Sequence, residues 1–152
     1  MLRRLVLVLA VGAIAVAAAN RWSSEAATGP ATIRITNKQV RYERVDLGRR
    51  GRTPGDTEVI VQLIYNQRVT PRAIGHAELV CTFTLDTSRS CRGTIFLPRG
   101  QIVVGGSLRF RGIYALAVLG GTGLYDNARG MVTVTRLGRS PRRELMYFRL
   151  TG

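Results

Sequence analysis

Three of the four residues from Gly120 to Gly123 are glycine, a density that also occurs in loops that bind phosphate groups. A P-loop places a lysine after its last glycine, whereas the only lysine of this chain is Lys38. The dinucleotide fingerprint G-x-G-x-x-G fails as well, because Asp126 occupies the position of its last glycine. The segment that follows, MVTVTRL, alternates like a strand, whereas both motifs need a helix. We therefore expect a turn between two strands here and no nucleotide site.

The sequence excludes two further kinds of catalytic site. A Ser-His-Asp triad would have to use His76, the only histidine, but the G-x-S-x-G turn of the α/β-hydrolases does not occur. One histidine and two cysteines are too few for a four-ligand zinc site unless carboxylates contribute. We therefore predict neither hydrolase chemistry nor a bound metal ion.

The first 19 residues are typical of a signal peptide. A short basic stretch, MLRR, precedes the apolar residues Leu5 to Ala19, which end in small side chains. This stretch is shorter than the ~20 residues that span a bilayer. We expect cleavage after Ala19 and a secreted, extracellular protein, with a retained membrane anchor as the alternative. In an oxidising compartment, the pair Cys81 and Cys91 favours one disulfide bond.

The chain is strongly basic, with a net charge of +14 that comes almost entirely from arginine. Such a charge attracts anionic polymers, and the densest basic patch is GRRGRTPG at residues 48–55. However, the arginines are scattered, aromatic residues make up only 7% of the chain, and no DNA- or RNA-binding motif occurs. We expect solvated arginines and no specific nucleic acid partner, with docking of an anionic polymer at residues 48–55 as the alternative.

Alternation of apolar and polar residues dominates the sequence after residues 20–31, a small and polar segment that we expect to be a flexible linker. In TEVIVQLIY, for example, Val59, Val61 and Leu63 share one face. Similar segments follow, separated by Gly, Pro or Ser turns. With a first strand around residues 33–46, the pattern predicts eight strands in one domain at residues 32–152. This number is typical of an antiparallel barrel or a sandwich, and an eight-stranded barrel can hold one small ligand.

Several segments resemble the dirigent and allene oxide cyclase superfamily. AVLGGTGLYDNARGMVTV at residues 117–134 is similar to its signature: a Gly-Gly-Thr-Gly turn, an aromatic residue two positions on, and Ala-Arg-Gly at the next strand. VDLGRRGRTPGDTEVIV at residues 45–61 and GQIVVGGSLRF at residues 100–110 resemble segments ahead of the signature. The resemblance implies an all-β, calycin-like, eight-stranded antiparallel β-barrel, which would follow the N-terminal signal helix predicted from residues 1–19. It also implies an apolar cavity, a trimer, and no cofactor or metal.

The resemblance indicates where a site would lie. Asp46 matches the aspartate that ends the family's first strand, and Arg129 matches the arginine of Ala-Arg-Gly, so both are candidate catalytic residues. In the alternative, Arg129 pairs with Asp126 or Asp46 and only fixes the turn. Tyr114, Tyr125 and Asp126 are candidate ligand-binding residues, although a tyrosine at a barrel rim also serves in packing. The structural glycines of the turn are Gly120, Gly121, Gly123 and Gly130.

Plant members of this superfamily steer bound reactants. Dirigent proteins direct the coupling or ring closure of phenolic intermediates, and allene oxide cyclases fold a fatty-acid epoxide for cyclisation. By resemblance, we expect a secreted barrel that binds a small apolar or phenolic molecule. If it is an enzyme, we expect a cofactor-free isomerase or cyclase. The alternative is a non-catalytic extracellular module that docks anionic polymers or a partner protein through its arginine-rich surface.

Overall fold

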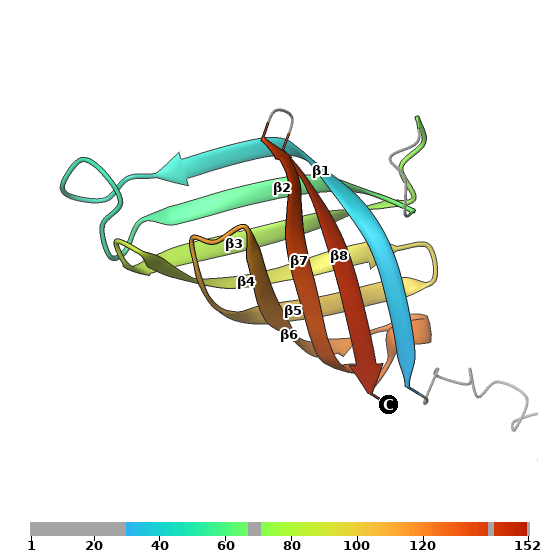
Figure 1. The fold of residues 1–152 in the computed structure, drawn as a ribbon. Coiled ribbons are helices and arrows are strands. Elements are labelled where there is room, and N and C mark those ends of the chain that lie inside the picture. Colours follow the sequence, from blue (N-terminus) through green and yellow to red (C-terminus); the bar gives the residue numbers. More distant parts are fainter. Residues whose placement is uncertain (1–29, 67–70, 140–141, 152) are drawn as a thin grey trace, which may run out of the picture.

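The computed structural model describes residues 30–66, 71–139 and 142–151, which form one closed barrel (Figure 1). Eight antiparallel strands follow one another around the barrel in chain order, and the last pairs with the first. The elements are β1 (Ala31–Val45), β2 (Thr57–Tyr65), β3 (Gly75–Leu85), β4 (Ser88–Leu97), β5 (Gly100–Arg109), β6 (Ile113–Gly121), the 3-10 helix η2 (Gly123–Tyr125), β7 (Arg129–Arg139) and β8 (Arg142–Thr151). The predicted eight-stranded antiparallel barrel is confirmed.

The predicted N-terminal segments fall almost entirely beyond the described residues. The signal peptide, residues 1–19, lies outside them, and so does the expected linker up to residue 29. Ala31, the last residue of that linker, already belongs to β1. Among the residues that are described, no helix is long and apolar enough to cross a membrane.

Strand β2 shows which face of an alternating segment turns inward. Val59, Val61 and Leu63 are only half-buried and lie on the outside of the barrel. The buried, inward set is Glu58, Ile60, Gln62 and Ile64. The more apolar face of this strand is therefore its outer face, and two polar side chains point into the barrel.

Strand β1 carries a bulge that brings two further polar side chains inward. Its pairing with β2 shifts by one residue between Gln39 and Arg41. A bulge of this kind reverses the alternation of side chains beyond it. Tyr42 consequently lies opposite Ile60, and Arg44 lies opposite Glu58, so both follow the inward side of β2.

A disulfide bond joins β3 to β4, as predicted for Cys81 and Cys91. The two residues are directly opposite each other in the ladder, with their Cα atoms 4.0 Å apart. Both side chains are buried in the barrel. The bond therefore fixes the register of these two strands close to the inward side chain of Glu58, which pairs with Cys81 across β2 and β3.

The two ends of the barrel differ in character. Apolar side chains fill the middle and the end near η2, among them Ile64, Ala77, Ile102, Val132 and Phe148, each without measurable exposure. The amide of Leu124 donates a hydrogen bond to the carbonyl of Arg99, which holds η2 against this end. We call it the η2 end. The polar end carries the β1–β2, β3–β4 and β5–β6 connections, and Figure 1 shows the β1–β2 loop and η2 far apart.

Candidate functional site

The polar end of the barrel holds an interior cluster of charged and polar side chains. Two carboxylates, Glu58 on β2 and Glu144 on β8, are 2% and 1% exposed. Asn37, Gln62 and Arg89 are buried beside them. Because an isolated buried charge is costly, each of these carboxylates needs matching donors. The structure supplies a separate set for each.

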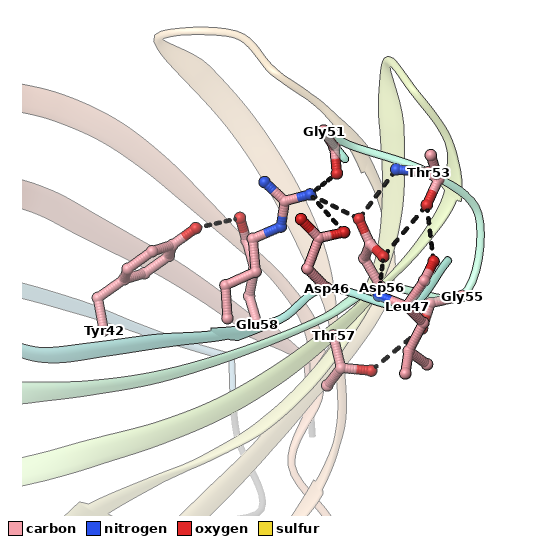
Figure 2. A network of polar contacts seen from close by, with 10 residues as sticks. Tyr42, Asp46, Leu47, Gly51, Thr53, Gly55, Asp56, Thr57 and Glu58 are labelled. Carbon is pink, nitrogen blue, oxygen red and sulfur yellow. Dashed lines mark hydrogen bonds and ion pairs between the residues drawn. The ribbon is translucent and has the colours of Figure 1, made fainter. Parts of the chain in front are cut away.

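Glu58 is held by a cation and a phenol. Arg89 on β4 is 5% exposed and forms an ion pair with Glu58 Oε2. The hydroxyl of Tyr42 donates a hydrogen bond of 2.6 Å to Glu58 Oε1, as Figure 2 shows. Tyr42 itself is 45% exposed. A chain of contacts thus leads from the solvent-facing rim to a buried carboxylate.

Glu144 is the centre of the second set. Its Oε2 atom accepts hydrogen bonds from the side-chain amides of Asn37 at 3.2 Å and Gln62 at 3.1 Å, and from the hydroxyl of Tyr114 at 3.4 Å. Its Oε1 atom lies 3.0 Å from Arg142. The described residues contain no group of three His, Cys, Asp or Glu side chains that could hold a metal ion.

Burial changes the acidity of the groups around these carboxylates. It raises the pKa of Tyr114 well above its usual value, and the charge of Glu144 raises it further. The Tyr114 hydroxyl therefore keeps its proton and acts as a donor. Burial also lowers the pKa of Arg89. Two buried acceptor atoms at this end, Asn37 Oδ1 and Gln39 Oε1, have no partner among the described residues.

The β1–β2 loop borders the polar end and is organised by one buried carboxylate, Asp56. Its oxygens accept hydrogen bonds from the amides of Leu47 and Thr53 at 2.8 and 2.9 Å, and its Oδ2 lies 2.6 Å from Arg44 (Figure 2). Arg44 also donates to the carbonyl of Gly51. The backbone hydrogen bonds from Thr53 and Leu47 lower the pKa of Asp56 to about 2, despite the opposing effect of burial. Asp56 thus acts as a structural anion.

No protein-family model and no curated protein matches the chain. Solved structures do. A pyocyanin demethylase superposes with a TM-score of 0.70 and 25% identity, over 80% of this chain and 100% of that one. The pterocarpan synthase dirigent protein GePTS1 superposes with a TM-score of 0.62 and 11% identity, over 80% of this chain and 82% of that one. The exo-specific intermolecular Diels-Alderase AbnU superposes with a TM-score of 0.63 and 13% identity, over 80% of this chain and 98% of that one.

The chain has a dirigent-like barrel fold. In this dirigent-like barrel, the glycine-rich stretch that resembles the family signature forms the connection around η2. Gly123 and Gly130 have φ angles of +62° and +125°, in the region that favours glycine. Tyr125 packs against the core, and Asp126 Oδ1 accepts a hydrogen bond from the amide of Asn127. The stretch lies at the η2 end, across the barrel from Glu58 and Glu144.

The dirigent-like barrel therefore separates the two residues predicted to be catalytic. Asp46 follows β1 at the polar end, where its Oδ1 is 3.9 Å from Arg44. Arg129 begins β7 at the η2 end, and its guanidinium donates to the carbonyl of Ala128. Neither is paired with the other, and no ion pair joins Arg129 to Asp126 within the described chain. Of the predicted ligand-binding residues, only Tyr114 belongs to the interior cluster.

Sequence reasoning missed both interior carboxylates of this dirigent-like barrel. Glu58 and Glu144 each lie in an alternating segment, and only the apolar residues of such a segment predict a core. One signal was available: in TEVIVQLIY, Glu58 and Gln62 fall on the same face as Ile60 and Ile64. Polar residues that share one face of a strand with isoleucines indicate a polar patch inside a barrel.

Proposed function

We propose that this chain binds a small apolar or phenolic molecule at the polar end of its barrel and steers a stereoselective cyclisation or coupling without a cofactor. The observation that carries the proposal is the pair of buried carboxylates, Glu58 and Glu144, each of which accepts a hydrogen bond from a tyrosine hydroxyl. A carboxylate in this setting serves as a general acid or base once a ligand brings an exchangeable proton within reach.

The contact between Tyr42 and Glu58 supports a phenolic ligand in particular. It shows that Glu58 Oε1 accepts a phenol hydroxyl in a short hydrogen bond. A ligand hydroxyl that displaced the half-exposed Tyr42 would meet the same acceptor. If the ligand then passed its proton to Glu58, the positive charge of Arg89 would stabilise the phenolate. The unpartnered oxygens of Asn37 and Gln39 would accept further hydroxyl groups.

The similar barrels are consistent with this proposal. Their names concern small organic molecules: pyocyanin, a pterocarpan, and the reactants of a Diels–Alder addition. We propose for this chain a related task, in which the barrel holds a reactive molecule in one orientation and excludes water. Asp46 stands at the rim of the polar end and remains a proposed participant. Arg129 would act only on a ligand at the η2 end.

We further propose that the protein is exported. The disulfide between Cys81 and Cys91 supports this, because such bonds persist in oxidising compartments. The signal peptide predicted at residues 1–19 agrees with it. Sequencing of the exported protein should give an N-terminus at Asn20. An intact N-terminus in membrane-bound protein would instead support the retained anchor.

Calorimetric titration with 4-ethylphenol and its methyl ether, 4-ethylanisole, tests the proposed function. We expect the phenol to bind more tightly than the ether at 0.5 M salt, because only the phenol donates to a carboxylate. The variant Tyr42→Phe should tighten phenol binding, since it frees Glu58 Oε1. Glu43→Gln changes an exposed residue next to Tyr42 on β1 and serves as the control. Equal binding of phenol and ether, or binding lost at high salt, would contradict the proposal; salt-sensitive binding is what polymer docking predicts.

A further inference from the structure

Within the closed barrel, the ladder between β5 and β6 stops short of the hairpin tip at the polar end. The ladder between these strands runs from Ile102↔Gly121 to Gly105↔Ala117 and no further within the described chain. Both strands nevertheless continue: β5 pairs with β4 as far as Arg109, and β6 pairs with β7 from Ile113. Residues 106–109 and 113–116 therefore form no ladder pairs with each other in the described chain. We call this unpaired stretch the β5–β6 seam.

The tip of the β5–β6 hairpin contacts side chains from other elements of the polar end. Phe110 at this tip packs 5.5 Å from Phe83 on β3, measured between ring centroids. The guanidinium groups of Arg52 and Arg89 lie 4.4 and 5.2 Å from the centroid of the Phe110 ring. Gly106, at the point where the ladder stops, has a φ of +150°. These contacts join the tip to β3, to β4 and to the β1–β2 loop.

A concavity of about 310 Å³ occupies the seam. Residues 107–109, 111 and 113–115 line it. Ile113, which is 61% exposed, contributes apolar surface, and Arg109 and Arg111 contribute two exposed cations. No acidic residue belongs to the lining, and neither guanidinium is paired with a carboxylate in the described chain. Tyr114 belongs both to this lining and to the interior cluster, through its hydrogen bond to Glu144.

We propose that the β5–β6 seam binds a small aromatic ligand that carries a carboxylate. Arg109 and Arg111 pair with the carboxylate, because guanidinium groups match its planar geometry and no acidic neighbour competes. The ring packs on the exposed side chain of Ile113. Its far side meets Tyr114, which links the seam to Glu144 inside the barrel. This inference rests on the proposed function and adds the ligand's charge and its point of entry.

Binding of 4-hydroxyphenylacetate and of its uncharged methyl ester tests this inference by calorimetry at 50 mM salt. We expect the acid to bind about fivefold more tightly than the ester, the effect of one solvent-exposed ion pair of roughly 1 kcal/mol. The variant Arg109→Gln/Arg111→Gln should abolish this difference and leave ester binding unchanged. Arg92→Gln, an exposed arginine on the outer face of β4, is the matched control and should keep the difference.

The outcomes distinguish a failure of the proposed seam site from a failure of the proposed function. If acid and ester bind equally, or if the double variant keeps the preference, the seam does not bind the carboxylate, while small-molecule binding stands. If neither compound binds, both the proposed function and this inference fail. Amide chemical shifts give a second measurement: on titration with the acid, the largest changes should fall at residues 107–115. Changes confined to another face of the barrel would overturn the inference.

Discussion

The hydroxyl of Tyr42 lies 2.6 Å from Oε1 of Glu58. This hydrogen bond joins a half-exposed side chain at the barrel rim to a buried carboxylate. The ion pair between Glu58 and Arg89 continues this chain of contacts to β4. Three strands of the barrel thus meet through polar groups at the point where a ligand is proposed to bind. The stability and the proposed activity of the polar end therefore depend on the same residues.

Removal of the Glu58 charge should destabilise the barrel strongly. The variant Glu58→Gln leaves the guanidinium of Arg89 buried without its ion-pair partner. We expect a loss of about 3–5 kcal/mol in the free energy of unfolding, measured with urea. Adding Arg89→Met to this variant should recover part of the loss. Glu43→Gln breaks the exposed pair with Arg41 and should cost less than about 1 kcal/mol. Equal stability of the wild type and Glu58→Gln would contradict a buried ion pair.

The pKa of Asp56 predicts an acid-sensitive loop. This pKa is lowered from 3.8 to about 2 in the folded protein, mainly by the amides of Thr53 and Leu47. A group with a lowered pKa stabilises the fold above its unfolded value, and this stabilisation is lost as the pH falls toward the folded value. We expect the free energy of unfolding to decrease between about pH 4 and pH 2.

Two variants isolate the contribution of Asp56 to this acid sensitivity. Asp56→Asn should be less stable than the wild type at pH 7, and the difference should shrink at pH 2. Asp86→Asn, at an exposed position in the β3–β4 turn, should leave the pH dependence of the wild type intact. A stability difference for Asp56→Asn that stays the same from pH 7 to pH 2 would show that Asp56 is not held as an anion.

The disulfide between Cys81 and Cys91 should contribute measurably to stability. The two residues are separated by 10 positions in the sequence, so the bond closes a short loop. In the chain-entropy model such a loop corresponds to about 2–3 kcal/mol. The variant Cys81→Ala/Cys91→Ala should unfold at a correspondingly lower urea concentration, and reductant should have no further effect on it. Free thiols in the exported wild-type protein would contradict the bond.

Gly130 should resist substitution even by alanine. Its φ is +125°, and a Cβ atom there would press against the carbonyl oxygen of Arg149 on the neighbouring strand β8. We expect Gly130→Ala to cost about 1–3 kcal/mol or more in the free energy of unfolding. Gly112→Ala is the control, because no atom lies within 4 Å of the position its Cβ would take. Similar melting temperatures for the two variants would contradict the strained geometry.

The sequence predicted the fold well because alternation and turn residues are local signals. The strand at residues 57–65 and the total of eight strands followed directly from them. The site was harder to predict, because the inward face of a strand depends on closure of the whole barrel. In β2 the outer face carries valines and a leucine, and the inner face carries Glu58 and Gln62. The bulge near Val40 in β1 turns Tyr42 toward Glu58. The alternation of apolar and polar residues in the sequence does not predict this bulge.

Asp46 and Arg129 illustrate a second limit. Each is a candidate through its resemblance to a family motif, and a motif alone does not show which end of a barrel its residue occupies. Strand order and register place Asp46 beside Arg44 at the polar end and Arg129 opposite Thr151 at the η2 end. The two residues therefore lie at opposite ends of the barrel. Tyr114 was the one candidate that joins the buried carboxylates, through its hydrogen bond to Glu144.

Mapping a bound phenol onto the protein tests the proposed site most directly. We expect 4-ethylphenol, titrated into labelled protein, to shift the amide resonances near Tyr42, Glu58, Tyr114 and Glu144 at the polar end. Residues 121–129 at the η2 end should remain unchanged. Shifts concentrated at residues 121–129, or an absence of saturable shifts anywhere in the barrel, would contradict ligand binding at the buried carboxylates.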